Sequence, residues 1–241
     1  MPDQNLFLRS LSPNLFELLR PRLQRRDLPA GTVLFMTGGK VNTVHFLQAG
    51  AVSLVSELRN GQMIESAMVG RDGLIGGGAV LDDRDAFYKA IVQVSASAFM
   101  LDVDFVRHIA RDSEELRSAI IRNEQLILAQ AQQSAACNAA HNLSERLSRW
   151  LLRVRDATGS DSFGLTQEFI AEMLGVGRTS VSLVAHTLQQ AGLIKYRRGQ
   201  ITIQNVEGLQ ETACECYWAV KTHYDRLLSP VASSSKQMRN I

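Results

Sequence analysis

The stretch from Leu165 to Ile194 constrains the fold of this chain more strongly than any other part. Thr166 has the side chain of a helix N-cap, and apolar residues follow it at helical spacing. Gly175-Val176-Gly177 then interrupts the pattern, because glycine readily adopts the left-handed backbone that a sharp turn between helices needs. A second helix is predicted from Arg178 to Ala191. Two short helices with a tight glycine turn predict a helix-turn-helix.

The second predicted helix is amphipathic, and its outward face is polar at the N-terminal end. Its inward face is apolar and consists of Val181, Val184, Ala185 and Leu188. Arg178, Thr179 and Ser182 remain on the outside. These side chains can hydrogen-bond to base edges in the major groove of DNA.

A basic β-hairpin is predicted directly after this helix, from Leu193 to Ile203, with its turn at Arg198-Gly199. No acidic residue occurs from Met173 to Val206, a range that includes several basic ones. Such a local excess of positive charge suits a phosphate backbone. The sequence therefore predicts a winged helix-turn-helix. The alternative interpretation is a small helical hairpin that only packs on a core.

This stretch and its wing resemble the DNA-binding half of the Crp-Fnr family of bacterial transcription regulators, and the resemblance extends from about residue 6 to Val206. It implies a homodimer that binds a palindromic operator in double-stranded DNA, with RNA polymerase as a candidate partner. Arg178 is then expected to bind guanine, with Thr179 and Ser182 on neighbouring base edges. The expected contacts to the DNA backbone come from Thr166, Gln167, His186, Lys195, Arg197 and Arg198.

Charge differs between the two halves of the chain although the net charge is only +2. The range from Asp27 to Asp104 has nine acidic and five basic residues, whereas the range from Ser144 to Asn205 has five acidic and eight basic residues. This difference predicts two domains, with nucleic acid at the basic one. The chain has no apolar run of membrane-spanning length and no secretion signal at its start, and its cysteines are few, so we expect a cytoplasmic protein. No phosphate loop, nucleophile elbow or His-Glu metal motif indicates an enzyme.

The first half reads as a series of short strands separated by glycine turns. The predicted strands are Thr32–Met36, Thr43–Gln48, Ala51–Leu58, Gln62–Val69 and Ala90–Leu101, with a turn at Ala49-Gly50 between the second and the third. This pattern predicts a β jelly-roll, which is similar to the cyclic-nucleotide-binding domain of the family. The expected fold class is α+β, with this domain, a long dimerisation helix and a C-terminal winged helix-turn-helix domain.

The region from Gly73 to Val94 departs from the cyclic-nucleotide-binding members of the family. Those proteins have a Gly-Glu-Leu-Gly type pattern and an Arg-Ser pair, which hold the ribose and the cyclic phosphate. This chain has Gly76-Gly77-Gly78-Ala79 and Ala86-Phe87-Tyr88 instead, and Arg84 is surrounded by aspartates. We therefore expect no control by cAMP or cGMP. A weak effector pocket is predicted at Gly76, Gly77, Arg84, Phe87 and Tyr88, where the two aromatic residues either contact an unidentified small molecule or belong to the barrel core.

The other sensor chemistries of the family lack their ligands here, so we expect no cofactor and no metal. An iron–sulfur cluster needs a group of thiolates, and the N-terminal region has no cysteine. His45 and His108 are lone histidines, which are usually packing or surface residues rather than haem ligands. Cys214 and Cys216 are spaced too closely for the usual zinc or redox pair, and residues two apart on a helix point away from each other. They are interpreted as ordinary helix residues.

A helix of about two dozen residues is predicted from Ser113, and its seam suggests a parallel dimer. The dimer residues predicted from this seam are Leu116, Ile120, Asn123 and Ile127. The alternative is a helix that packs on its own barrel. The expected domains are a barrel at 1–112, a dimerisation helix and hinge at 113–141, a winged helix-turn-helix at 142–206 and an extra helix with a tail at 207–241. A second functional class, a ligand-sensing barrel whose DNA-binding domain is weak or vestigial, remains open from the sequence.

Overall fold

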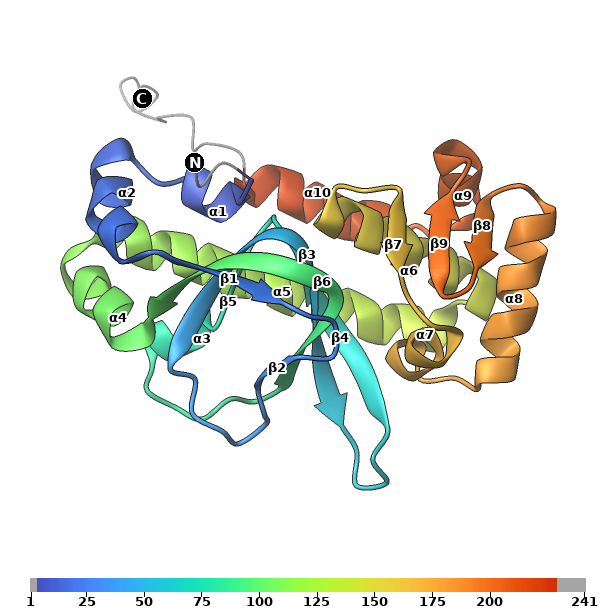
Figure 1. Cartoon of the computed structure of the whole chain (residues 1–241), viewed down its shortest axis with the longest axis horizontal. Coiled ribbons are helices and arrows are strands. Elements are labelled where there is room, and N and C mark those ends of the chain that lie inside the picture. Colours follow the sequence, from blue (N-terminus) through green and yellow to red (C-terminus); the bar gives the residue numbers. More distant parts are fainter. Residues whose placement is uncertain (1–3, 229–241) are drawn as a thin grey trace, which may run out of the picture.

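The computed structural model describes residues 4–228 and has a β-rich half and a helical half, bridged by one long helix (Figure 1). The first half consists of α1 (Leu6–Arg9), α2 (Pro13–Leu19), the 3-10 helix η1 (Arg20–Arg22), β1 (Gln24–Leu28), β2 (Val33–Phe35), β3 (Thr43–Glu57), β4 (Met63–Val69), β5 (Leu74–Ile75), α3 (Gly77–Leu81), β6 (Lys89–Asp102) and α4 (Val103–Asp112). The rest consists of α5 (Glu114–Ala140), α6 (Leu143–Thr158), β7 (Ser162–Gly164), α7 (Gln167–Leu174), α8 (Arg178–Gln190), β8 (Ile194–Arg197), β9 (Gln200–Ile203), α9 (Val206–Thr212) and α10 (Cys216–Leu228). The tail predicted at 229–241 lies outside the described residues.

The first half is an antiparallel sheet built around the two longest strands, β3 and β6. The strand order is β1-β6-β3-β4, while β2 pairs with β6 and β5 pairs with β3. The two long strands pair from Thr43 opposite Asp102 to Val55 opposite Lys89. Aliphatic side chains from both strands fill the interior, including Leu47, Leu54 and Val92. The predicted α+β fold, with a sheet-rich N-terminal domain, a long helix and a C-terminal helix-turn-helix, is confirmed.

The turn predicted at Ala49-Gly50 is wrong, because β3 continues through it. Its pairing with β6 shifts on both sides of Ala49, and Gly50 has φ +84°. A Cβ atom on Gly50 would lie 2.5 Å from the Cα of Ala96. Glycine therefore lets the long strand bulge against its neighbour without ending it. The sequence analysis also missed β1, since most of its side chains are polar and exposed.

The long helix α5 packs on the barrel of its own chain through two amide side chains. The Asn123 side chain accepts from the Leu74 N–H and donates to the Leu74 carbonyl, both at 3.0 Å. Gln130 pairs in the same way with the N–H and carbonyl of Met68, at 2.8 and 3.1 Å. Each side-chain amide thus pairs with both backbone groups of one barrel residue, as a residue of a neighbouring strand would.

The residues predicted to form the dimer interface therefore face the barrel of their own chain, and their assignment to the interface must be corrected. Leu116, Ile120 and Asn123 are at most 5% exposed within a single chain, and Ile127 packs against the barrel interior. The sequence shows a stripe on this helix, but it cannot show whether the stripe meets a second helix or a sheet. The alternative interpretation, packing on the chain's own barrel, is correct for these residues.

The C-terminal half begins with α6. The sequence Asn142-Leu143-Ser144-Glu145 at the start of this helix predicts a capping box, with Asn142 as N-cap and Glu145 at N3, and the structure confirms it. The Asn142 side chain accepts from the N–H groups of Ser144 and Glu145, and the Glu145 carboxylate accepts from the Asn142 N–H at 3.0 Å. The small sheet of this half has the order β7-β9-β8. Trp150, Leu151 and other apolar residues of α6 form a core with the helix-turn-helix.

The single helix predicted from Glu207 to Leu228 is wrong, since it is two helices, α9 and α10. Ala213, Cys214 and Glu215 separate them, and Ala213 is extended with φ −75° and ψ 149°. Helix α10 returns over α5 and α6 (Figure 1). There Leu126 packs with Val220 and Tyr224. The extra segment therefore joins the two halves of the chain.

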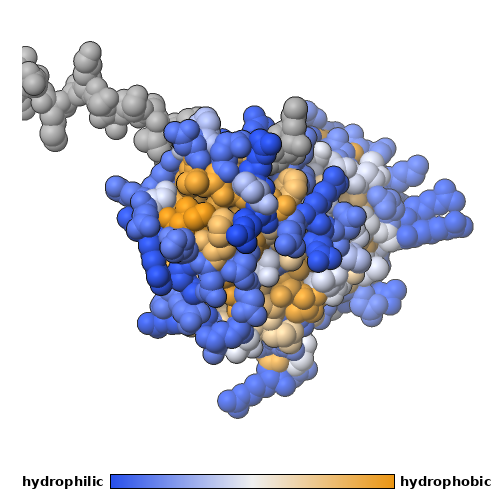
Figure 2. Space-filling view, turned by 60° about the vertical axis from the view of Figure 1, so that its left-hand side comes forward, coloured by the Kyte–Doolittle hydropathy of each residue, from blue (hydrophilic) through white to orange (hydrophobic). Residues whose placement is uncertain are grey.

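The side of the molecule seen in Figure 2 is mostly hydrophilic, with apolar areas between the polar ones. The most exposed large apolar side chains include Phe87, Leu183, Leu18 and Leu128. Within residues 4–228, no helix combines the length and the apolar character needed to cross a bilayer.

Candidate nucleic-acid interface and effector pocket

Local sequence signals set the geometry of the helix-turn-helix. The Thr166 hydroxyl caps α7 by accepting from the Phe169 N–H at 3.1 Å. Gly175 ends α7 in the left-handed region with φ +65°, and Gly177 is the N-cap residue of α8. Because Gly177 has no side chain, the first turn of α8 is open to an approaching ligand.

The predicted base-reading residues lie in this first turn of α8. Arg178 and Thr179 are exposed, as recognition requires. Ser182 is half-buried, and its hydroxyl lies 2.5 Å from Oε1 of Gln167 and 3.1 Å from the Arg178 carbonyl. Ser182 and Gln167 therefore connect the two helices, while the Nε2 group of Gln167 is still able to donate to a phosphate.

The predicted backbone-contacting residues surround this helix and include the wing. His186, Lys195, Arg197 and Arg198 are all exposed, as is Thr166, whereas Gln167 is half-buried. Arg198 and Gly199 form the tip of the wing with φ values of +52° and +75°, the backbone of a tight hairpin turn. Across residues 4–228, no carboxylate lies within ion-pair distance of Arg178, Lys195, Arg197 or Arg198. The positive charge of this face is thus available to an external anion.

Leu183 is an apolar feature of the same face that the sequence analysis did not assign to DNA contact. It lies on α8 and is 68% exposed, although α8 buries its other large aliphatic positions such as Val181 and Leu188. An exposed leucine on a recognition helix suits the methyl group of thymine.

The helix-turn-helix unit is anchored to the barrel by polar contacts of α6. The Trp150 indole donates to Oε1 of Glu65 at 3.0 Å, and burial raises the pKa of Glu65 to about 7. The Arg153 guanidinium pairs with Asp72 at 2.6 Å and donates to the Met68 carbonyl at 2.8 Å. Both members of this ion pair are buried, and separating them would leave a buried charge without a partner. The pair therefore holds α6 in one position on the sheet.

The predicted effector pocket is not assembled as one site. Arg84 is exposed and pairs with Asp82 at 2.6 Å, and Phe87 is 81% exposed. Tyr88 belongs to the barrel interior, where its ring lies 5.6 Å from that of Phe35. The prediction that Phe87 belongs to the barrel core is therefore wrong, whereas it is confirmed for Tyr88.

A carboxylate from α5, that of Glu124, lies against Gly77 of the predicted pocket and against Gly78. Gly76 is the left-handed N-cap residue of α3, with φ +89°. A Cβ atom on Gly77 would lie 2.7 Å from Oε1 of Glu124, and the Glu124 carboxylate accepts from the Gly78 backbone. Burial raises the pKa of Glu124 to about 7. The missing side chain of Gly77 leaves room for this close approach. The sequence does not reveal the contact, because Glu124 lies far along the chain from Gly77.

Comparisons with known proteins agree with this geometry in both halves. Residues 25–113 match cyclic nucleotide-binding domains, and residues 145–212 match Crp-like helix-turn-helix domains. The chain is 23% identical to a global nitrogen regulator of Synechococcus elongatus over 78% of this chain and 89% of the relative. It is also 23% identical to a cyclic AMP receptor protein of Thermus thermophilus, over 84% of this chain and 94% of the relative. The solved structure of FixK2 from Bradyrhizobium japonicum superposes with a TM-score of 0.68 at 15% identity, covering 80% of this chain and 98% of that one.

Fold and site together define a two-domain regulator, in which a cyclic-nucleotide-binding-like barrel is joined to a Crp-like helix-turn-helix. The chain belongs to the Crp-Fnr family of transcription regulators.

Proposed function

We propose that this chain is a homodimeric transcription regulator that binds a specific palindromic DNA site without control by cAMP or cGMP. The observation that carries the proposal is the open first turn of α8, where Arg178 and Thr179 are exposed beside a basic wing. Arg178 would bind guanine, and Thr179 and Leu183 would contact neighbouring bases. Thr166, His186, Lys195, Arg197 and Arg198 would hold phosphates, with Ser182 and Gln167 supporting the two helices.

The exposed face of α5 supports the homodimer. Ile121 and Leu128 are 44% and 57% exposed, one heptad apart. The full exposed stripe has the alternating spacing of a coiled-coil seam and consists of Ile121, Gln125, Leu128, Gln132, Ala135 and Ala139. We propose this stripe as the dimer seam, in place of the stripe that packs on the barrel. A dimer through α5 would present two α8 helices to adjacent turns of a duplex.

Independence from cyclic nucleotides rests on Glu124 and on the residues that replace the Arg-Ser pair. The phosphate of a cyclic nucleotide needs a guanidinium and free amide groups. Here the Gly78 amide already donates to the Glu124 carboxylate, and Arg84 is paired with Asp82. An ionised Glu124 would repel a phosphate at this position. The cAMP named for some relatives is therefore not proposed as the effector of this chain.

Selection of bound sequences from a random duplex pool tests the DNA-binding proposal. The expected product is a palindrome whose half-sites lie about one helical turn apart. Arg178→Ala should weaken binding to this site by roughly 1–3 kcal/mol and relax the preference at one position. Arg25→Ala, which removes an exposed arginine of β1, should leave affinity unchanged. Equal weakening on all sequences contradicts base reading by Arg178, and failure to bind any duplex at low salt favours the sensor with a vestigial DNA-binding domain.

Light scattering of the purified protein tests the dimer seam. Leu128→Glu places a charge in the proposed seam and should convert the dimer to a monomer. Leu183→Glu is the matched control, because this leucine is also exposed (68%, against 57% for Leu128) but lies on α8. A monomeric parent protein, or a dimer that tolerates Leu128→Glu, contradicts the assignment. Addition of cAMP or cGMP should change neither the melting temperature nor the affinity for DNA, and a shift in either contradicts the proposed independence.

A further inference from the structure

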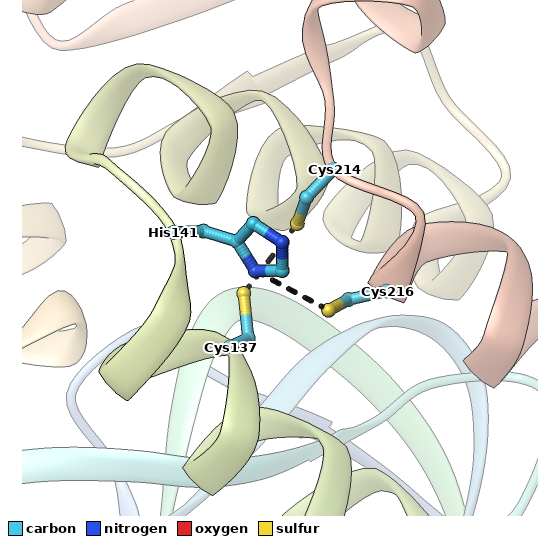
Figure 3. A group of neighbouring side chains, drawn as sticks. All are labelled: Cys137, His141, Cys214 and Cys216. Carbon is cyan, nitrogen blue, oxygen red and sulfur yellow. Dashed lines mark hydrogen bonds between the residues drawn. The ribbon is translucent and has the colours of Figure 1, made fainter.

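Four potential metal ligands meet where α5, α6 and the C-terminal extension converge. Cys137 lies near the end of α5, His141 follows that helix, Cys214 lies between α9 and α10, and Cys216 begins α10. Figure 3 shows all four side chains pointing toward one another. Their ligand atoms lie within 4.8 Å of one another, and the three cysteines are free and buried. The interpretation of Cys214 and Cys216 as ordinary helix residues is therefore wrong, since Cys214 lies in the break between two helices.

We propose that Cys137, His141, Cys214 and Cys216 bind one zinc ion, which clamps the winged helix-turn-helix unit to α5. The distances between ligand atoms fit a single ion. Zn–S and Zn–N bonds in a tetrahedron place neighbouring ligand atoms about 3.4–3.8 Å apart. Here Sγ of Cys137 lies 3.5 Å from Sγ of Cys214, and Sγ of Cys216 lies 3.6 Å from Nδ1 of His141.

The ligand set favours zinc over other metals. Three thiolates and one imidazole form a soft set that suits zinc in tetrahedral geometry. All four positions are filled by the protein, which is typical of a structural site rather than a catalytic one. A four-iron cluster lies between its thiolates and holds them farther apart than a single ion does. The compact arrangement therefore fits one ion.

Side chains around the cluster orient the ligands as those around a metal site do. Nε2 of His141 lies 3.2 Å from Oε2 of Glu215, while Nδ1 faces Sγ of Cys216. A proton on Nε2, beside this carboxylate, would leave the lone pair of Nδ1 free to bind a metal ion. Metal-bound histidines usually have such a carboxylate on the second ring nitrogen. The Gln133 amide donates to Sγ of Cys216 at 3.0 Å, a bond that stabilises a thiolate. Packing of three buried thiols by itself requires neither the carboxylate beside His141 nor the amide beside Cys216.

The electrostatics of the cluster also fit a cation. A free buried thiol holds its proton, whereas a metal ligand must be a thiolate. A bound cation reverses this preference and releases protons as it binds. Arg146 interacts electrostatically with Cys137 and Cys214, and so offsets the net negative charge of an ion with three thiolates. The same guanidinium donates to the carbonyl of Leu174 at 2.5 Å, at the end of α7.

The position of the site in the chain indicates what the ion does. Cys137 and Cys214 are 77 residues apart, and the winged helix-turn-helix lies between them. The ion would thus tie together the two points at which this unit joins the rest of the chain. Closing a long loop stabilises the folded arrangement, and Arg146 passes the constraint on to α7. Loss of the ion should loosen the hinge and change the placement of α8.

Metal analysis of the full chain, purified without chelators, tests the proposal directly. We expect one zinc ion per chain, released when the cysteines are titrated with a mercurial reagent. Growth with cobalt should give the visible absorption bands of tetrahedral Co²⁺ with thiolate ligands. Both measurements use the unaltered protein, so they do not depend on the folding of a variant. Protein without stoichiometric metal, protein with iron and labile sulfide, or a disulfide between Cys137 and Cys214 in freshly purified protein overturns the assignment.

Variants separate the ligands from their neighbours. Cys214→Ser and His141→Ala should each lose the zinc, whereas His108→Ala, at an exposed histidine of α4, should retain it. Glu215→Gln keeps all four ligands and should bind zinc roughly 10–100-fold more weakly. Full zinc retention by Cys214→Ser also contradicts the site.

The effect on DNA is a separate readout, which rests on the proposed function. Removal of zinc should weaken binding to the selected DNA site by roughly 10-fold. Unchanged affinity after removal overturns the clamp but not the metal site. If the protein binds no DNA at all, the zinc content, the cobalt spectrum and the variants still decide the metal site.

Discussion

Replacing Glu124 by Gln should make the stability of this protein respond differently to pH. The carboxylate lies beside Gly77 and accepts from the backbone of Gly78, and burial raises its pKa from 4.5 to about 7. Since one pKa unit corresponds to about 1.4 kcal/mol, ionising this group in the folded protein costs up to roughly 3 kcal/mol. Gln resembles the protonated acid and can still accept from the Gly78 N–H.

The direction follows from proton binding in the two states. Between pH 4.5 and about 7 the unfolded chain has released the proton of Glu124, while the folded protein retains it. The stabilising contribution is therefore fully present below pH 4.5 and is lost as the pH rises to about 7. Glu124→Gln removes this loss. Its free energy of unfolding, relative to the parent protein, should thus rise by up to roughly 3 kcal/mol between pH 5 and pH 8.

Urea unfolding of both proteins at several pH values measures this difference. Two other buried groups also titrate, since burial raises the pKa of Glu65 to about 7 and lowers that of His45 to about 4. Their contributions to the pH dependence act in opposite directions. Each is the same in the variant and in the parent protein, so neither affects the difference between the two proteins at a given pH. Glu17→Gln is a suitable control, because this side chain of α2 is 59% exposed. A difference between Glu124→Gln and the parent that does not change with pH refutes the reasoning.

Three further substitutions test the packing of the two halves and of the barrel. Asp72→Asn leaves the buried guanidinium of Arg153 without its counter-charge, and should lower the free energy of unfolding by about 3–5 kcal/mol in urea; a loss below 1 kcal/mol contradicts the importance of the pair. Gly50→Ala and Gly61→Ala both place a side chain at positive φ, but only the first brings Cβ within 2.5 Å of Ala96. Gly50→Ala should therefore be less stable than Gly61→Ala by roughly 1–3 kcal/mol in thermal unfolding, and equal losses contradict the role of the bulge.

Signals within a few residues of one another predicted the local elements well. The capping box of Asn142 and Glu145 and the cap of Thr166 depend only on a side chain that reaches its own backbone. The left-handed Gly175 similarly follows from the absence of Cβ. These features are confirmed because each is satisfied by neighbours along the chain.

Features that depend on what lies opposite an element were not predictable in the same way. Leu116 and Ile120 form an apolar stripe that a partner subunit or the chain's own barrel could equally cover, and the structure covers it with strands and short helices of the barrel domain. Gly50 has the sequence signature of a turn, yet the pairing with β6 makes it a bulge. In both cases the local pattern is compatible with two environments, and packing selects one.

Two sites became visible only in the tertiary structure. One is the position of Glu124 beside the glycines of α3, and the other is the cluster of Cys137, His141, Cys214 and Cys216. No spacing along the chain links Glu124 to the glycines of α3, and Cys214-Glu215-Cys216 alone resembles no common ligand pair. The break after α9 and the return of α10 over α5 bring these segments together. The sequence by itself determined the helix-turn-helix, the wing and the barrel, because those follow from periodicity, caps and turns. The tertiary structure decided which side chains from distant segments share a site, since that depends on how completed elements pack.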